Sequence, residues 1–273
     1  MREDFWPLIT TTRKEKPLDS IGAEDFKKIY GGLFVERTER SLEGLIAEFN
    51  PTSIVVFEEG LPTLYDPNQL SSPLRFHLNI GALRLQKVQN NGNDRFLEVS
   101  GIEAGMKVLD GTLGLGTDAL LSAWAVGDTG KVVALEGSKA IFSIVDFSLH
   151  KIGQGGDDLL AELARRIEVK QIEFSAYSKA QEANTFDIVY LDPMFDKPRG
   201  KSIGIQPIRL WAFDQLLTAE TAREAFRLCK RRVIIKEAKG SHCWEELSVD
   251  IPSTLTGKRY QSIRYRILDK ESI

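Results

Sequence analysis

The sequence predicts an α/β protein in which a small N-terminal α/β domain precedes a mostly parallel sheet with one antiparallel strand. From residue 108 onward, short apolar runs alternate with helical patterns, as in parallel strands joined by helical crossovers. Residues 108–119 form a strand, a glycine-rich turn and a helix start, and the run 260–267 alternates like an antiparallel strand. We expect the domain boundary near residue 90, giving domains 1–90 and 91–273.

Composition narrows the class of protein. A chain of 273 residues with 42% hydrophobic content can bury a large core and form two domains. We find no run typical of a signal peptide or of a bilayer span, and two cysteines suggest neither a disulfide framework nor a metal site. We therefore expect a cytoplasmic protein without a membrane partner. The net charge of −3 argues against nucleic-acid binding over the whole surface, although a local basic patch remains possible.

The first 70 residues predict alternating strands and helices. Strands are expected at 8–12 and 33–35, helices at 20–30 and 41–49, and a hairpin over 54–65. The basic residues of this part can form a solvated face or contact RNA: Arg13, Lys14 and Lys16.

The segment from 71 to 93 connects the two domains and cannot be assigned to one element. Its basic residues stand among apolar ones, so they could line a substrate groove: Arg75, His77, Arg84 and Lys87. His77 is more typical of a hydrogen-bonded structural histidine than of a base. A short helix over 94–100 then leads to the glycine-rich turn.

The glycine-rich turn predicts a ligand loop. Gly114, Gly116 and Ala119 fit the G-x-G-x-x-A fingerprint of Rossmann-like folds, where the backbone approaches a bound cofactor. Asp110 ends the strand before the loop, and its carboxylate suits a cationic ligand better than a pyrophosphate. This pattern resembles the first motif of class I methyltransferases, which bind S-adenosylmethionine (SAM), a sulfonium that also carries an ammonium.

The next two strands end on acids. The strand 132–135 ends on Glu136, twenty residues after Gly116, where a carboxylate can bind ribose hydroxyls. Ser138 caps a helix to Lys151, and a helix over 157–166 precedes a strand at 167–172. In this fold class the acid that follows, Glu173, can accept from the adenine amine. The predicted cofactor contacts are Asp110, Gly111, Thr112, Gly114, Gly116, Asp118, Glu136 and Glu173.

A second motif follows the strand 187–191. Asp192-Pro193-Met194-Phe195 resembles the (D/N)-P-P-(Y/F) motif of amino-group methyltransferases, with methionine replacing the second proline. An exocyclic amine is a poor nucleophile because its lone pair is delocalised into the ring. The Asp192 carboxylate and the Pro193 carbonyl can accept its two N–H groups, and Phe195 can stack on the extruded base. We therefore predict Asp192, Pro193 and Phe195 as catalytic residues.

Together, residues 109–119 and 190–195 resemble the RsmJ family, methyltransferases of a guanine amine in bacterial small-subunit ribosomal RNA, and more closely a Firmicute-type branch. The resemblance covers residues 94–270. It implies methylation of a nucleobase amine, guanine in ribosomal RNA first, with ribosomal RNA or the small subunit as partner. Thr117 stands where RsmJ proteins carry arginine, so a cofactor or substrate contact can differ there.

The loop after the motif supplies the predicted substrate contacts. Its basic side chains could clamp RNA phosphates, or it could be a solvated loop. Arg209 stands where the family has an arginine after this loop. The predicted substrate-binding residues are Met194, Lys197, Arg199, Lys201 and Arg209.

The C-terminal part predicts packing elements. An amphipathic helix over 219–229 would bury Cys229, which is then a packing residue and not a nucleophile. A buried strand over 233–235 would end at Lys236, before the final antiparallel strand.

Three other functions remain open on the sequence. The same reaction could act on another RNA site, a DNA adenine or a small amine. A ribosome-associated protein could retain SAM without turnover, although such a protein has no need for the acceptor pair of Asp192 and Pro193. A nicotinamide oxidoreductase would bind NADH and would have no use for Asp192.

Overall fold

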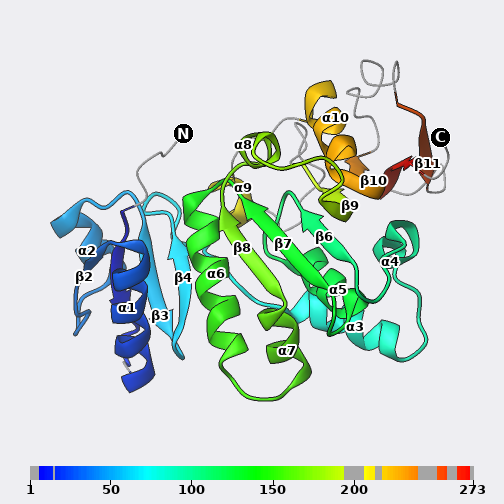
Figure 1. Cartoon of the computed structure of the whole chain (residues 1–273). Coiled ribbons are helices and arrows are strands. Elements are labelled where there is room, and N and C mark those ends of the chain that lie inside the picture. The colour runs from blue at the N-terminus through cyan, green and yellow to red at the C-terminus, as the bar shows by residue number, and fades with distance from the viewer. Residues whose placement is uncertain are drawn as a thin grey trace.

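Two β-sheets form the framework of the molecule (Figure 1). The computed structural model describes residues 6–14, 16–193, 206–212, 217–238, 251–256 and 263–270. Within these residues one sheet has five strands and the other has seven. The predicted α/β class is confirmed.

The seven-stranded sheet has the order β11-β12-β10-β9-β6-β7-β8. Its strands are β6 (Lys107–Asp110), β7 (Lys131–Glu136), β8 (Ile167–Gln171), β9 (Phe186–Leu191), β10 (Cys229–Ala238), β11 (Ser253–Thr256) and β12 (Ile263–Asp269). Strands β6 to β10 pair in parallel, and β12 is antiparallel to both neighbours, as predicted. The strand order reverses at β6, which lies between β7 and β9. A switch point of this kind opens a ligand crevice at the carboxyl ends of the strands.

Helices cover both faces of this sheet because alternate strand residues are apolar on each side. Val108 and Ile188 belong to one buried cluster, whereas Leu109 and Val189 belong to another. The helices are α4 (Arg95–Ser100), α5 (Thr117–Val126), α6 (Lys139–Gly153), α7 (Leu159–Arg165), α8 (Phe174–Lys179), α9 (Gln206–Arg209) and α10 (Ala219–Leu228). Ser138 caps α6 as predicted, since its hydroxyl accepts from the Ile141 N–H.

The five-stranded sheet has the order β2-β1-β3-β4-β5. Its elements are β1 (Leu8–Thr11), α1 (Pro17–Tyr30), β2 (Leu33–Phe34), α2 (Leu42–Phe49), β3 (Ile54–Glu58), β4 (Leu61–Tyr65) and β5 (Leu74–Arg75). The predicted hairpin is β3–β4, turned at Glu59 and Gly60, which both have positive φ. The connecting segment contains β5 and the helix α3 (Asn79–Gln89), which the sequence pattern did not predict.

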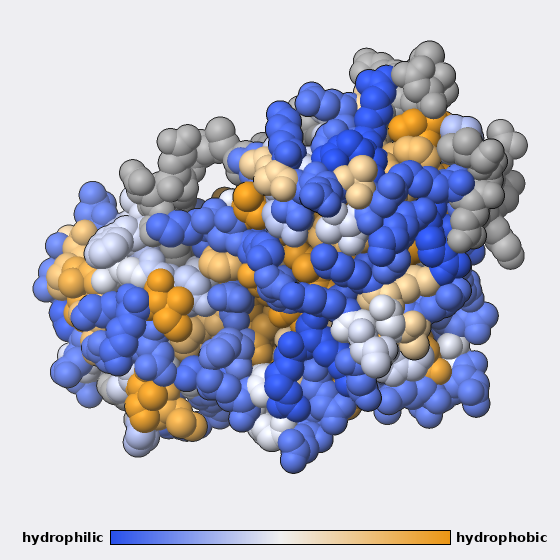
Figure 2. All heavy atoms as spheres, in the orientation of Figure 1, coloured by the Kyte–Doolittle hydropathy of each residue, from blue (hydrophilic) through white to orange (hydrophobic). Residues whose placement is uncertain are grey.

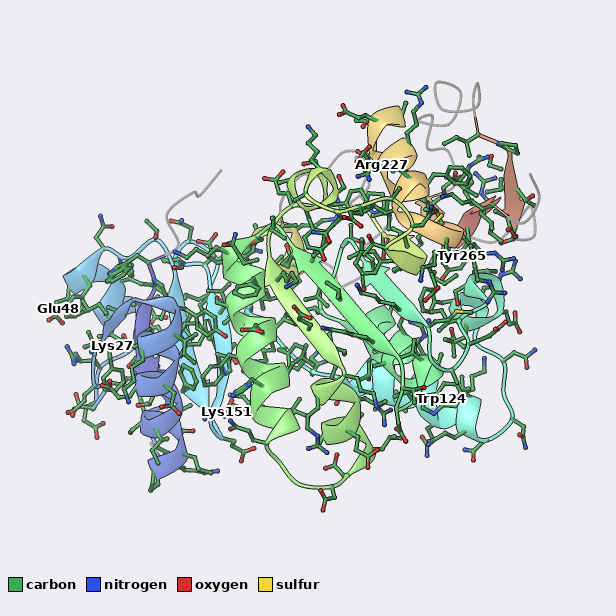
Figure 3. All side chains as sticks on the ribbon, viewed as in Figure 1. Lys27, Glu48, Trp124, Lys151, Arg227 and Tyr265 are labelled. Atoms are coloured by element: carbon green, nitrogen blue, oxygen red, sulfur yellow. The ribbon has the colours of Figure 1, made fainter. Side chains whose placement is uncertain are left out.

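Helix α6 joins the two sheets. It lies between β4 and the seven-stranded sheet in Figure 1, and its Phe147 ring lies 5.5 Å from the rings of Phe26 and Phe57. The Tyr30 hydroxyl donates to Asp146 at 2.6 Å. Lys151, labelled in Figure 3, donates to Asp25 of α1. One buried cluster therefore continues from the first sheet to the second, and the domain boundary near residue 90 stays a prediction.

Some predicted elements have different limits in the structure. Helix α10 ends at Leu228, and Cys229 is the first residue of β10, so the predicted helix was one residue too long. Cys229 is nevertheless fully buried in the core, as expected of a packing residue. Strand β10 continues past Lys236 to Ala238 because its pairing with β12 extends to Ile263. Helix α7 begins at Leu159, since Asp158 caps it.

The face shown in Figure 2 is mostly hydrophilic, with separate small apolar areas. Single exposed apolar side chains are normal on protein surfaces. Among the described residues, no helix combines the length and the apolar character needed to cross a bilayer.

Candidate functional site

The carboxyl ends of three neighbouring strands bring three predicted acids to one edge of the sheet. Asp110 ends β6 and Glu136 ends β7, while Asp192 directly follows β9. The register pairs Asp110 with Ala134 on one side and with Tyr190 on the other, so the three acids lie at the ends of adjacent strands. They lie around the first residues of the loop 111–116, here called the glycine loop.

The glycine loop needs glycine for two physical reasons. Gly114 and Gly116 have φ values of +53° and +74°, in the left-handed region that glycine adopts without strain. A Cβ on Gly111 would lie 2.5 Å from Leu191 and 2.7 Å from Phe174, so only hydrogen fits there. The loop can therefore turn sharply between β6 and α5.

Asp110 is a buried acid at the start of this loop. Its side chain accepts from the Thr112 N–H at 3.0 Å, and the residue is only 2% exposed. Burial raises its pKa to about 8, and the charges of Asp118, Asp192 and Glu136 add to this effect. A cation bound beside Asp110 would reverse this shift.

Glu136 is held by backbone amides. It accepts from the Gly114 N–H at 3.1 Å and from the Ser138 N–H at 2.8 Å, and is 8% exposed. Burial raises its pKa to about 7, although these backbone amides act in the opposite direction. The contact with Gly114 ties the end of β7 to the glycine loop.

These groups fit the charge of SAM. Asp110 and Glu136 are carboxyls whose ionised forms a cation would stabilise, and SAM carries a sulfonium and an ammonium. The first hydrogen bond of α5 runs from the Leu120 N–H to the Gly116 carbonyl. The amides of residues 117–119 therefore precede the helical ladder and can donate to a ligand carboxylate.

Asp192 is connected to the glycine loop and to a lysine. Its N–H donates to Thr112 Oγ1 at 2.6 Å, and its Oδ2 lies 2.5 Å from Lys236 Nζ. Burial raises the pKa of Asp192, whereas Lys236 lowers it. Pro193, the second acceptor predicted, is buried next to it. The Asp192 carboxylate thus lies beside the glycine loop.

Asp118 accepts hydrogen bonds from side chains on two other elements. Its Oδ1 accepts from Arg84 at 2.6 Å, and its Oδ2 accepts from the Tyr190 hydroxyl at 2.8 Å. Arg84 also donates to both oxygens of Asp94 through two of its nitrogens. Asp118 therefore connects α3 and α5 to β9, and its predicted contact with the cofactor stays a prediction.

Three of these residues had no assigned role from the sequence: Lys236, Tyr190 and, beyond a suggested groove, Arg84. The missing information was strand pairing. Once β10 is known to pair with β9, Ile235 lies opposite Leu191, and Lys236 follows beside Asp192. Helix spacing alone gives no signal for Arg84, because its partners lie ten and 34 positions away.

The remaining predicted residues divide into two groups. Glu173 is the N-cap of α8 and is half-buried. Arg209 is the last residue of α9. A Cβ added to Gly114 would lie 3.7 Å from the side chain of Ile208 in the same helix. Helix α9 thus lies near the glycine loop. The other predicted contacts lie outside the described residues: Met194, Phe195, Lys197, Arg199 and Lys201.

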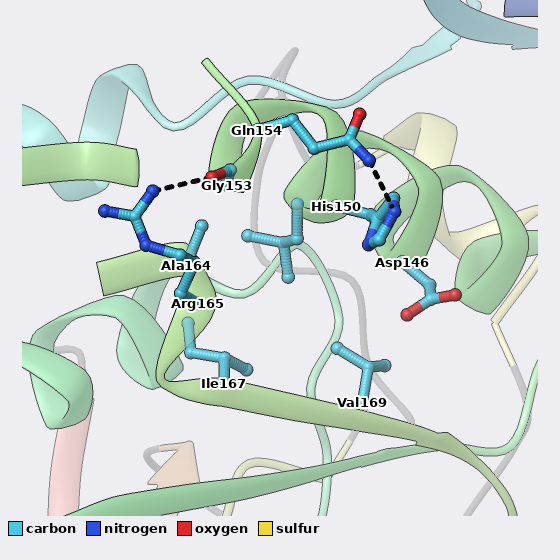
Figure 4. Close-up of a pocket in the computed structure, with 9 residues that line it drawn as sticks. Asp146, His150, Gly153, Gln154, Ala164, Arg165, Ile167 and Val169 are labelled. Carbon is cyan, nitrogen blue, oxygen red and sulfur yellow. Dashed lines mark hydrogen bonds between the residues drawn. The ribbon is translucent and has the colours of Figure 1, made fainter. Parts of the chain in front are cut away.

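A cavity of about 490 Å³ lies elsewhere, between α6, α7 and β8 (Figure 4). Its polar lining residues already bind neighbours: His150 contacts Gln154, and Arg165 donates to the Gly153 carbonyl. No predicted site residue lines it. Within the part of the chain that the structure describes, no cluster of acids, histidines and cysteines could hold a metal ion.

The sequence matches the model of a protein family over residues 50–263, and this family is described as "Putative SAM-dependent methyltransferase". A crystal structure of a SAM-dependent methyltransferase from Neisseria gonorrhoeae superposes with a TM-score of 0.63 and covers 97% of each chain. Its identity to this chain is 18%, so it supports the fold alone.

Curated relatives of this chain include proteins named as methyltransferases. YpiP of Bacillus subtilis is 30% identical over 89% of this chain and 93% of its own length. The ribosomal RNA small subunit methyltransferase J of Idiomarina loihiensis is 32% identical over 62% of this chain and 65% of its own. Its namesake in Pseudomonas aeruginosa is 26% identical over 71% and 73%. With the glycine loop and the sheet order, these matches show that the chain belongs to the SAM-dependent methyltransferases of class I, resembles RsmJ and uses SAM as its cofactor.

Proposed function

We propose that this enzyme transfers the methyl group of SAM to an exocyclic amine of a nucleobase, with guanine in small-subunit ribosomal RNA as the first substrate to test. We further propose that it acts in the cytoplasm. The observation that carries the proposal is the contact between Asp192 and the cofactor loop, through the Asp192 N–H and Thr112 Oγ1. The names of the relatives that act on ribosomal RNA support the choice of RNA.

The residues of this chain would act by placement. SAM supplies an electrophilic methyl group on its sulfonium. Asp110 and Glu136 would hold the cationic and ribose ends, and the glycine loop would let the backbone approach them. Asp192 and the Pro193 carbonyl would accept the two amine N–H groups, so that the nitrogen lone pair points at the methyl carbon. Correct placement of two reactants can supply most of the rate enhancement.

The test is the variant Asp192→Ala. We expect it to bind SAM with nearly unchanged affinity and to lose methyl transfer by about 100-fold or more, because an acceptor of the amine protons is removed. Calorimetry measures SAM binding, with NADH as a negative control. Labelled methyl transfer onto ribosomal RNA from cells that lack the protein measures the reaction.

The variant Asp192→Asn is the matched control. It keeps one acceptor oxygen at nearly the same volume, so it should retain more activity than Asp192→Ala. An unaffected rate in Asp192→Ala would contradict the role proposed for this residue. Binding of NADH without SAM would instead favour the oxidoreductase alternative.

A further inference from the structure

Lys236, on the strand that pairs with β9, contacts two acids of the candidate site. The Nζ of Lys236 lies 2.5 Å from Asp192 Oδ2 and 3.7 Å from Asp118 Oδ2. Its side chain is only 20% exposed, so water screens these interactions weakly. The lysine comes from β10 and the acids come from β9 and α5, so the contact forms only in the folded chain.

Without a nearby cation, burial and the charge of Asp118 would disfavour the ionised form of Asp192. Burial raises the pKa of Asp192, and the charge of Asp118 raises it further, whereas Lys236 lowers it. A protonated Asp192 would carry a hydrogen on one oxygen and could not take a proton from a substrate. Lys236 therefore favours the form of Asp192 that can accept from an amine.

Lys236 itself stays positively charged. Burial opposes its charge, but Asp192 and Asp118 outweigh this effect and raise the pKa of the lysine. Tyr265 pairs with Lys236 across β10 and β12, and burial raises its pKa to about 12, so its phenol stays neutral. Lys236 is therefore a fixed cation and does not serve as a base.

Asp118, the second acid beside Lys236, is itself held by other side chains. Asp118 is bound by Arg84 at 2.6 Å and by Tyr190 at 2.8 Å, so it cannot follow the lysine freely. The titratable groups that face the Lys236–Asp192 pair are Arg84, Asp110, Asp118, Tyr190 and Tyr265. They come from α3, β6, α5, β9 and β12.

We infer that Lys236 is a positioning residue for methyl transfer: it binds Asp192 Oδ2 and leaves Oδ1 to accept from the substrate amine. Among the described residues, Oδ1 makes no hydrogen bond, while Oδ2 contacts the lysine. The amine lone pair forms the new N–C bond, and the S–C bond breaks with its electron pair passing to sulfur. The proton released by nitrogen passes to Oδ1 and then to water. This inference rests on the proposed function.

The first test compares the full-length wild type with K236M and K236R. We expect K236M to bind SAM normally and to lower kcat about 100-fold, as loss of placement does. The acid limb of its kcat profile should move to higher pH, because Asp192 loses the charge that lowers its pKa. K236R keeps a cation and should restore this limb toward the wild-type position.

A matched control is K170M, which removes a lysine paired with Glu168 on β8, a strand separated from β9 and Asp192 by β6 and β7. It should change neither kcat nor the pH profile. A K236M variant with wild-type kcat and an unmoved acid limb would overturn the inference.

A second readout requires no turnover. Carbon NMR titration of the Asp192 carboxyl, assigned with D192N, should give a higher pKa in K236M than in the wild type. If K236M unfolds at a lower temperature while this pKa stays at its wild-type value, Lys236 serves folding alone and the inference fails. If the wild type binds SAM but methylates no amine, the proposed function fails instead, and the titration still decides the role of Lys236.

Discussion

Two buried acids should make SAM binding depend on pH, if Asp110 and Glu136 bind the cofactor as proposed. Asp110 and Glu136 have pKa values of about 8 and about 7, both raised chiefly by burial. A bound cation favours their ionised forms, so SAM binding should release protons at neutral pH. We expect the affinity to rise between about pH 6 and pH 9 and then to level off, since both acids are ionised above their raised pKa values.

Calorimetry in buffers with different ionisation enthalpies measures this proton release. The variant Asp110→Asn removes the acid with the higher pKa and should flatten the upper part of the pH dependence. Constant affinity across this range, with no proton exchanged, would contradict the assignment of these acids to the cofactor.

The sequence predicted Asp110, Glu136 and Asp192 as site residues because each stands at the end of an apolar run, where a parallel strand presents ligand groups. It did not identify the partners of Asp192. Lys236 looks like the end of a strand in the sequence, and only the pairing of β10 with β9 brings it to the acid. Contacts between distant segments leave no pattern in the local sequence.

At the scale of elements, the start of α5 depends on a left-handed glycine. Gly116 is the N-cap of α5 with φ +74°, so Gly116→Ala should cost about 1–2 kcal/mol of unfolding free energy. The strain acts at the glycine loop, so we also expect weaker SAM binding. Denaturant unfolding and calorimetry measure the two effects.

Gly105 is the matched control for Gly116. It has φ +85° in the turn before β6, and a Cβ there would lie 3.4 Å from Thr129 Oγ1. Gly105→Ala should lose similar stability and keep SAM affinity. Equal effects of both variants on SAM binding would show that general destabilisation explains the loss.

Strongly patterned elements were predicted well, and boundaries were not. Ser138 caps α6 as expected, because a hydroxyl before a helical pattern satisfies a free N–H. The end of α10 was missed because Cys229 continues the apolar helix spacing while its backbone is already extended. Helix α3 was missed because its charges and apolar residues show little periodicity.

At the scale of the whole molecule, the two sheets share one core through α6. The rings of Phe26 on α1, Phe57 on β3 and Phe147 on α6 contact one another edge to face. Phe147→Ala should therefore cost about 3–5 kcal/mol and destabilise both sheets together. We expect one cooperative thermal transition in the wild type and in the variant, measured by calorimetry.

Phe226→Ala is a control for this prediction, because Phe226 packs on the other face of the large sheet. It should lower stability less, since Phe226 is only partly buried. Two separate transitions in the wild type would contradict a shared core and would favour two independently folding domains.

The chemical position of the transferred methyl group decides whether this enzyme methylates a base amine. Small-subunit ribosomal RNA from cells lacking the protein is incubated with the enzyme and labelled SAM, digested to nucleosides and separated by mass. We predict the label on the exocyclic amine of a base, guanine first, and its loss with Asp192→Ala. Label on a ribose or a ring carbon, from an enzyme that binds SAM normally, would contradict the role of Asp192 and Pro193 as amine acceptors.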